Sequence, residues 1–105
     1  MNIVTKPQGR IVLRLFVAGA TVSSQKATTA LNTVCEELRA SRPEAVVDLE
    51  IIDVLTDSDA AFLDQVFATP TVIRVSPSPT RRLFGDLSSP EMVMIGLQLL
   101  LEPVT

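Results

Sequence analysis

The pattern of apolar and polar residues in the first half of the chain predicts a strand, a helix and a second strand. A run of branched apolar residues from Ile11 to Ala18, interrupted only by Arg14, is typical of a strand covered on both faces. After a turn, with Ser23 or Ser24 as the cap, apolar residues recur at spacings of three and four as far as about Ser41, which indicates an amphipathic helix. Residues 46–54 again resemble a strand. Together these segments predict a right-handed parallel βαβ unit.

The second half of the chain predicts two more helices around a hairpin. Asp57 to Asp59 offer caps for a short helix that is expected to stop near Phe67. Strands are predicted at 71–75 and 81–84. Phe84 is either a core residue or an anchor for a partner, and we prefer the core. Ser89, Pro90 and Glu91 then mark the start of a terminal helix, which is expected to run to about Glu102. The apolar face expected for the short helix comprises Phe62, Leu63, Val66 and Phe67.

The order β-α-β-α-β-β-α is that of the thioredoxin fold, with a mixed four-stranded sheet in a single α/β domain of residues 1–105. Thr69-Pro70-Thr71 matches the signature of this fold, in which a proline after a cis peptide opens the third strand, so Pro70 is predicted to be cis. Residues 92–95 form a short apolar run that fits a strand as readily as a helix, because periodicity cannot separate the two. A second packing of the C-terminal half therefore stays open.

Composition and charge exclude several classes of function. The chain has 105 residues and a net charge of −3, which removes the attraction to phosphate on which nucleic-acid binding depends. The most apolar run, residues 92–101, is about half the length that a membrane-spanning helix needs. No signal peptide is evident near Met1, so the expected location is the cytoplasm.

Candidate catalytic groups are scarce. Thiol oxidoreductases carry Cys-x-x-Cys before the first helix, but here that segment is Thr21-Val22-Ser23-Ser24. The chain has one cysteine, Cys35, and no histidine, so neither a Cys/His nucleophile nor a zinc site can be assembled. Cys35 lies on the apolar stripe of the first helix and is expected to be a buried core thiol. No catalytic residue, metal or cofactor is expected, which leaves protein binding.

The terminal helix would be apolar over most of its circumference. Only Gly96 and Gln98 interrupt the large apolar residues between Met92 and Leu101. Either one side of this helix is exposed, as at a partner surface, or the whole helix is buried, and the sequence leaves both alternatives open.

Several short segments in order along nearly the whole chain form a specific pattern. They are Leu13–Gly19, Ile52–Leu55, Ala68–Thr71, Arg81-Arg82, Gly85–Ser88 and Ile95–Leu97. Together these segments resemble the KaiB family of circadian clock proteins. The resemblance implies a non-catalytic protein that binds the KaiC ATPase, a hexameric ring. It also implies two folds: a tetrameric ground state with a rearranged second half, and a thioredoxin-like state that binds KaiC. Further partners that it implies are a KaiA-like protein and competition with a histidine kinase.

The chain departs from the family where the two folds are expected to be balanced. Gln98 stands where clock members usually have Asp, two residues after Gly96. A glycine inside a helix weakens it, whereas Gln is a better helix former than Asp, so the two residues have opposing effects. We expect a divergent paralogue that rests in the thioredoxin-like fold, and a homodimer or homotetramer is a further possibility.

The leading hypothesis is an adaptor for a KaiC-like ATPase, in circadian or stress signalling. Its interface is expected to include Gln65 on the short helix and Arg81, Arg82 and Asp86 near the hairpin. The alternatives are a thioredoxin-like oxidoreductase that uses Cys35 or a substrate thiol, and an input domain of a sensor kinase.

Overall fold

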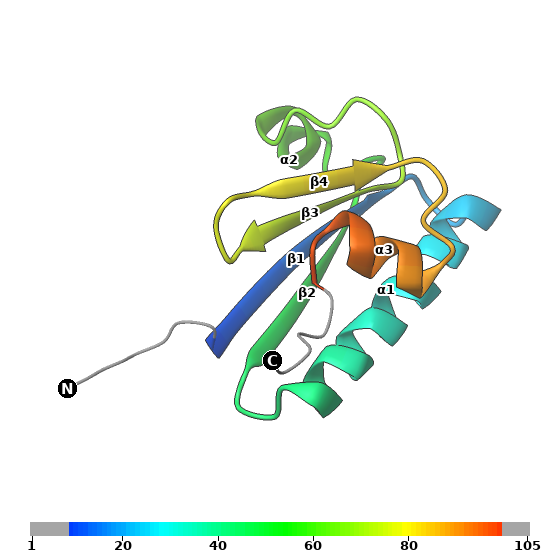
Figure 1. The fold of residues 1–105 in the computed structure, drawn as a ribbon. Coiled ribbons are helices and arrows are strands. Elements are labelled where there is room, and N and C mark those ends of the chain that lie inside the picture. Colours follow the sequence, from blue (N-terminus) through cyan, green and yellow to red (C-terminus); the bar gives the residue numbers. More distant parts are fainter. Residues whose placement is uncertain (1–8, 100–105) are drawn as a thin grey trace.

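The computed structural model describes residues 9–99, which form one sheet and three helices in the predicted order (Figure 1). The elements are β1 (Arg10–Val17), α1 (Val22–Ser41), β2 (Val46–Asp53), α2 (Ser58–Leu63), β3 (Thr71–Ser76), β4 (Arg81–Phe84) and α3 (Pro90–Gly96).

The four strands form a mixed sheet in the order β2-β1-β3-β4. β1 is parallel to β2, whereas β3 is antiparallel to both β1 and β4. β1 is therefore central and buried on both faces, as its continuous apolar run predicts. The thioredoxin-like arrangement is confirmed, and residues 92–95 are helical within α3. Thr69-Pro70 is cis, as predicted, and the Ser76-Pro77 and Ser78-Pro79 bonds are cis as well.

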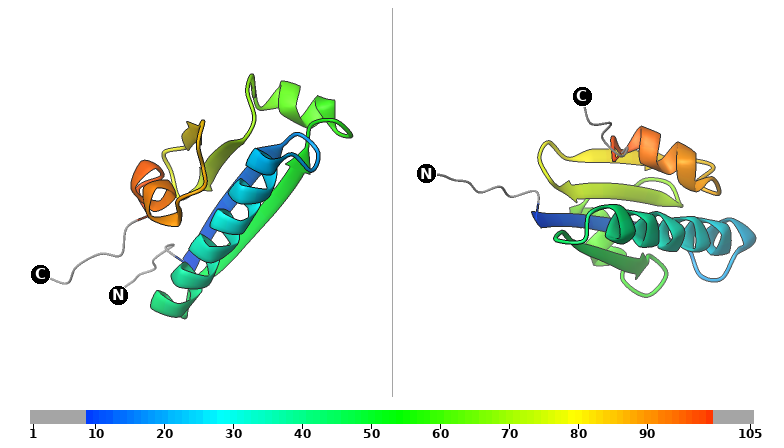
Figure 2. Two further views of the ribbon diagram at one scale, coloured as in Figure 1. Left: turned by 90° about the vertical axis from the view of Figure 1, so that its right-hand side faces the viewer. Right: turned by 60° about the horizontal axis from the view of Figure 1, so that its bottom comes forward.

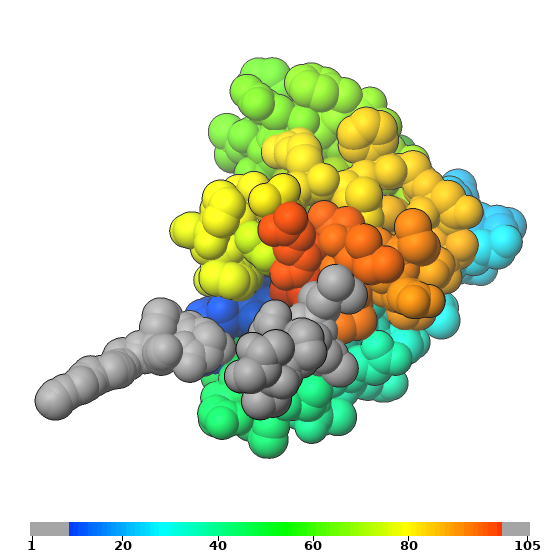
Figure 3. Space-filling view, viewed as in Figure 1, coloured from blue at the N-terminus to red at the C-terminus, as the bar shows by residue number. Residues whose placement is uncertain are grey.

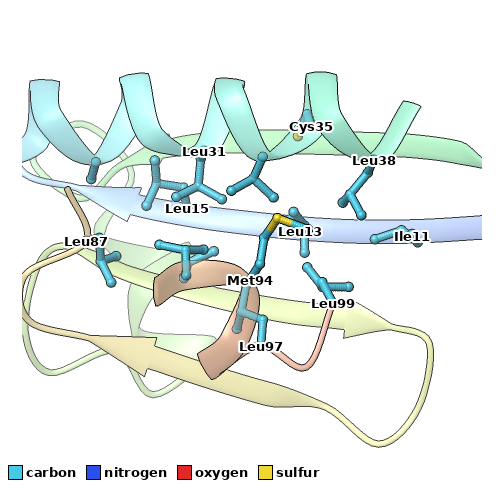
Figure 4. Close-up of a cluster of buried hydrophobic side chains, with 14 of the residues drawn as sticks. Ile11, Leu13, Leu15, Leu31, Cys35, Leu38, Leu87, Met94, Leu97 and Leu99 are labelled. Atoms are coloured by element: carbon cyan, nitrogen blue, oxygen red, sulfur yellow. The ribbon is translucent and has the colours of Figure 1, made fainter. Parts of the chain in front are cut away.

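The helices cover the two faces of the sheet unequally. α1 and α3 lie on one face and α2 lies on the other (Figure 2). The main core fills the space between β1, α1 and the α3 segment, where Leu13 and Leu15 meet Leu31 and Leu38 (Figure 4). The second core is small and contains Phe16, Ile52, Ala61 and Ile73.

Two helices end earlier than the sequence predicts. α2 stops at Leu63 instead of near Phe67, and the chain then turns through Gln65, whose φ is 56°. α3 stops at Gly96, so residues 97–99 are not helical, and the predicted continuation to Glu102 lies outside the described residues. The predicted cap of α1 also differs: Thr21, not Ser23 or Ser24, accepts the hydrogen bond from the Ser24 backbone N–H.

The terminal segment is mostly buried. Val93 and Met94 on α3, and Leu97 and Leu99 after it, lie in the main core, while Met92 and Ile95 remain exposed. None of the helices within residues 9–99 combines the length and apolarity needed to cross a bilayer.

Candidate protein-binding surface

The segment where thiol oxidoreductases carry their cysteines holds three hydroxyl side chains and the exposed Val22, and the hydroxyl groups form hydrogen bonds with one another and with the backbone. Thr21 Oγ1 donates a hydrogen bond to Ser24 Oγ at 2.8 Å, and Ser24 Oγ accepts one from the Ala18 N–H at 3.1 Å. Ser24 is buried, and its hydroxyl group helps to fix the start of α1. Within residues 9–99, no group of three or more His, Cys, Asp or Glu side chains is placed to hold a metal ion. This end of α1 therefore serves to cap the helix.

Cys35 is a core residue, as predicted. Its side chain is buried on the inner side of α1, between the turns that carry Leu31 and Leu38 (Figure 4). Burial raises the pKa of the Cys35 thiol; nearby Arg39 lowers it and Glu36 raises it further, both to a lesser extent. A thiol with a raised pKa and no solvent access is a poor nucleophile.

Three of the four apolar residues expected to form the core face of the short helix face solvent instead, and only Val66 packs against the second core. Phe62 is 81% exposed, Leu63 is 76% exposed and Phe67 is 92% exposed. The helix is too short to bury them: one and a half turns direct Ala61 toward the sheet, and the turn after Asp64 carries Phe67 away from it. α2 and the turn after it form the upper end of the molecule in Figure 3.

Phe84 is also 66% exposed, so the core, which the sequence analysis prefers to an anchor position, is wrong for this residue. β4 is an edge strand, and its side chains alternate between the two faces of the sheet. Arg82 and Phe84 pair with Ile73 and Thr71 on the side of α2, whereas Leu83 belongs to the side of α3. Phe84 therefore adds a third exposed aromatic ring to the surface beside α2.

Two hollows on this surface share Gln65 and Phe67. One lies between the turn after α2 and the strands β3 and β4, and it includes Arg82 and Phe84. The other lies along α2 and includes Asp59, Phe62 and Leu63. We call the surface formed by Phe62, Leu63, Gln65, Phe67, Arg82 and Phe84 the α2 face.

Two arginines hold α2 against the sheet. Arg82 donates to the backbone carbonyl oxygens of Asp64, at 2.7 Å, and Gln65, at 3.1 Å. Arg14 on β1 forms ion pairs with the Asp64 carboxylate, at 2.6 Å, and with Glu50 on β2, at 3.0 Å. The backbone beneath the exposed apolar residues is therefore fixed at the end of α2. This favours binding, because less conformational entropy is lost on association.

The four predicted interface residues do not form one cluster. Gln65 and Arg82 meet beside α2, as described above. Arg81 alternates with Arg82 and lies on the opposite side of β4, where it pairs with Arg74 across the ladder. Asp86 lies in the loop between β4 and α3, where it accepts hydrogen bonds from the N–H and hydroxyl group of Ser88. These two bonds lower the pKa of the Asp86 carboxyl group, burial opposes them slightly, and nearby Lys26 lowers it a little further.

The residues predicted to bias the fold, Gly96 and Gln98, lie at and beyond the end of α3. Gly96 is the last helical residue, and Gln98 has a left-handed backbone conformation with φ 55°. The expectation that they oppose each other through helix propensity is therefore wrong, because Gln98 is not in a helix.

Sequence reasoning missed Arg74, which joins three parts of the C-terminal half. This buried side chain lies on the α3 side of β3. It donates to the carbonyl oxygens of Leu97 at 2.8 Å, Gln98 at 3.3 Å and Pro79 at 2.7 Å. Burial, and to a lesser degree Arg81, lower its pKa. The only available signal was a charged residue inside the apolar run of residues 71–75.

Comparison with known sequences gives a consistent result over most of the chain. A family model described as KaiB domain matches residues 14–99. The circadian clock oscillator protein KaiB of Thermosynechococcus vestitus is 44% identical over 93 residues, which cover 89% of this chain and 82% of that protein. The protein of the same name from Prochlorococcus marinus strain SARG is 40% identical over 99 residues, which cover 94% of this chain and 81% of that protein.

Solved structures show the same fold at low sequence identity. The N-terminal domain of SasA from Synechococcus elongatus has a TM-score of 0.66 and 18% identity, and the match covers 98% of this chain and 100% of that domain. Thioredoxin from Fasciola hepatica has a TM-score of 0.65 and 18% identity, with 88% of this chain and 82% of that protein covered.

Proposed function

This chain belongs to the KaiB family, and from this premise we propose that it is a non-catalytic cytoplasmic adaptor for a KaiC-like hexameric ATPase, in circadian or stress signalling. The observation that carries the proposal is the contrast between two ends of one scaffold. The segment that corresponds to the thioredoxin cysteines carries hydroxyl groups that bond to one another and no thiol, while the α2 face presents aromatic rings on a fixed backbone.

The α2 face supplies the features that a protein interface needs. Aromatic residues and arginine are enriched at the centres of such interfaces, and here Phe67 and Phe84 flank Arg82 around one hollow. We propose Gln65 and Arg82 as contact residues on this face. Arg81 and Asp86, on other parts of the surface, would extend the contact around β4.

Further partners follow from the same premise. We propose that a KaiA-like protein, or a histidine kinase whose input domain shares this fold, competes or assembles with the chain on the ATPase. The SasA domain has the same fold as this chain, and proteins of similar shape can compete for one docking site. This shared fold is the support for the proposal.

The test is direct binding to a purified KaiC-like hexamer, followed by size-exclusion chromatography in ATP and in ADP. We expect co-elution in at least one nucleotide state. Phe84→Ser is expected to weaken binding at least about tenfold, as for an aromatic residue that carries interface energy. Val22→Ser serves as the matched control, because Val22 is an exposed apolar residue at the start of α1. Absence of a complex in both nucleotide states, at high protein concentration, would reject the proposal.

A further inference from the structure

The shape of the α2 face depends on how α2 ends. The Gln65 N–H donates to the Phe62 carbonyl group at 3.1 Å, and the Val66 N–H donates to the Ala61 carbonyl group at 2.9 Å. Together with the positive φ of Gln65, these two bonds form a Schellman motif, which turns the chain away from the helix axis. The apolar contact that usually accompanies the motif is present, since Val66 packs against the core that contains Ala61. The next residue, Phe67, is left on the surface.

Gln65 does not favour this motif by itself. The left-handed position of a Schellman motif is usually a glycine, because a residue with a Cβ atom is strained there. The spacing of the apolar residues, moreover, fits a helix that continues to Phe67. The observed turn therefore depends on contacts from other parts of the chain.

Asp64, the residue before the turn, is held from two strands. Arg14 on β1 donates to the Asp64 carboxylate at 2.6 Å, and Arg82 on β4 donates to its carbonyl oxygen at 2.7 Å. Arg82 also donates to the carbonyl oxygen of Gln65 at 3.1 Å. Arg14 is itself oriented by Glu50 on β2, which accepts a hydrogen bond from Arg14 Nε at 3.0 Å and leaves Nη1 for Asp64.

Arg14 and Asp64 support the α2 face from below. Neither residue lines the two hollows of this face, and their side chains are only 29% and 27% exposed. We propose that Arg14 is a positioning residue for partner binding. It acts through Asp64 to hold the turn at Gln65, and it raises the affinity of the α2 face for its partner without contacting that partner. The identity of the partner, a KaiC-like ATPase, rests on the proposed function.

The opposite charges of the pair separate positioning from direct attraction. Arg14→Gln removes a positive charge, and Asp64→Asn removes a negative one. If these charges acted directly on the ATPase, the two substitutions would change the dissociation constant in opposite directions. Positioning predicts one direction, so each variant should bind a KaiC-like hexamer about threefold to tenfold more weakly in titration calorimetry. The double variant should bind no more weakly than either single variant, because both remove one contact.

A second ion pair between β1 and β2 provides the matched control. Arg10 binds Asp48 at 2.9 Å, but this pair is more exposed and joins no other element. Arg10→Gln and Asp48→Asn make the same chemical changes and should each leave the dissociation constant within about twofold of the unmodified value. Opposite changes from Arg14→Gln and Asp64→Asn overturn the proposal, and so does an equal loss from Arg10→Gln.

The geometry of the turn is measured on the chain alone by NMR. The three-bond coupling between the amide proton and Hα of Gln65 reports its φ, and amide relaxation of residues 65–67 reports the order of the turn. Arg14→Gln should move the coupling toward a helical value and lower the order of Phe67. Arg14→Lys should keep both close to the unmodified chain, because lysine retains a positive charge facing Asp64. An unchanged coupling and unchanged order in Arg14→Gln overturn the proposal.

The two measurements distinguish failure of this proposal from failure of the proposed function. If the unmodified chain binds no KaiC-like hexamer but Arg14→Gln loosens the turn, the proposed function is refuted and the action of Arg14 on the turn is supported. If the hexamer binds the unmodified chain and the Arg14→Gln variant equally well, only the role of Arg14 is refuted.

Discussion

Gly96, the last residue of α3, lies so close to Leu83 on β4 that a side chain at position 96 requires the end of the Leu83 side chain to move. A Cβ atom on Gly96 would lie 2.7 Å from Leu83 Cδ2 and 3.0 Å from Leu83 Cδ1. The usual helix-weakening effect of a glycine matters less at position 96, because Gly96 is the last residue of α3 and does not lie in the helix interior. The glycine therefore determines how closely α3 can approach the sheet.

Gly96→Ala is expected to destabilise the chain by about 1 kcal/mol, since overpacking costs more than the alanine gains in helix propensity. Leu83→Ala removes the crowding atoms at the cost of a small cavity. The double variant should therefore be more stable than the sum of the two single effects predicts, by about 1 kcal/mol. Urea unfolding of all four proteins measures this coupling, and additive effects would contradict the contact.

Arg74 is expected to be the most sensitive polar residue of the C-terminal half. Arg74→Met keeps much of the side-chain volume but leaves the carbonyl groups of Leu97, Gln98 and Pro79 without their donor. Hydrogen bonds from a charged group are worth about 1.5–3 kcal/mol each and are not additive, so we expect a loss of about 2–4 kcal/mol in urea unfolding.

The same substitution at Arg81 is the matched control for Arg74. Arg81 lies opposite Arg74 in the β3–β4 ladder, but it is exposed. Arg81→Met should change the free energy of unfolding by no more than about 0.5 kcal/mol, as is usual for the surface. Equal losses in the free energy of unfolding at both positions would contradict the special role of the buried contacts of Arg74.

Gln98 has a left-handed backbone conformation, which favours glycine. Gln98→Gly should therefore stabilise this fold by about 0.5–1 kcal/mol, since strain is removed from the native state and only part of the gain is lost to chain entropy. Gln25→Gly, inside α1, should have the opposite sign. Chemical denaturation of both variants checks the pair, and destabilisation by Gln98→Gly would contradict the assigned conformation.

The part of the fold that the sequence predicted well is the part with long periodic signals. The run at residues 11–18 and the stripe of α1 each extend over enough residues to separate a strand from a helix. Two of the four residues predicted for the partner surface, Gln65 and Arg82, lie together on the structure. Their meeting depends on β4 pairing with β3, which the hairpin pattern indicated.

The errors lie where the sequence carries little periodic information. The sequence predicts one apolar helical face from Phe62, Leu63, Val66 and Phe67. The helix ends at Leu63, so these side chains do not form a continuous face against the sheet. The reason is the left-handed backbone conformation at Gln65. A glycine at this position would have indicated such a turn, but glutamine does not. The sequence does not predict the burial of Arg74, because charged side chains are rarely buried without hydrogen-bond partners. The partners of Arg74 are backbone carbonyl groups up to 24 positions away along the chain.

The pKa of Asp86 should be below its ordinary value of about 3.9 in the folded chain, because Ser88 donates two hydrogen bonds to the carboxylate. A folded-state pKa below the unfolded one adds stability above the unfolded pKa, and this stability is lost as the pH falls through the folded pKa. The Asp86 contribution should therefore be constant from pH 7 to about pH 5 and disappear in more acidic solution.

An NMR titration of the Asp86 side-chain carboxyl carbon measures this shift directly. Ser88→Ala removes the hydroxyl donor at 2.6 Å and should raise the Asp86 midpoint toward its ordinary value. A midpoint at or above about 3.9 in the unmodified chain would contradict the two hydrogen bonds.

Cys35 should behave as a buried core thiol and not as a redox group. Because burial raises its pKa and excludes solvent, native protein at neutral pH should react with Ellman's reagent at least about 100-fold more slowly than the chain in concentrated urea. Insulin reduction should stay at background, since Thr21 and Ser24 carry no thiol that can exchange. Rapid labelling of the native thiol, or insulin turnover that Cys35→Ala abolishes, would restore the oxidoreductase alternative.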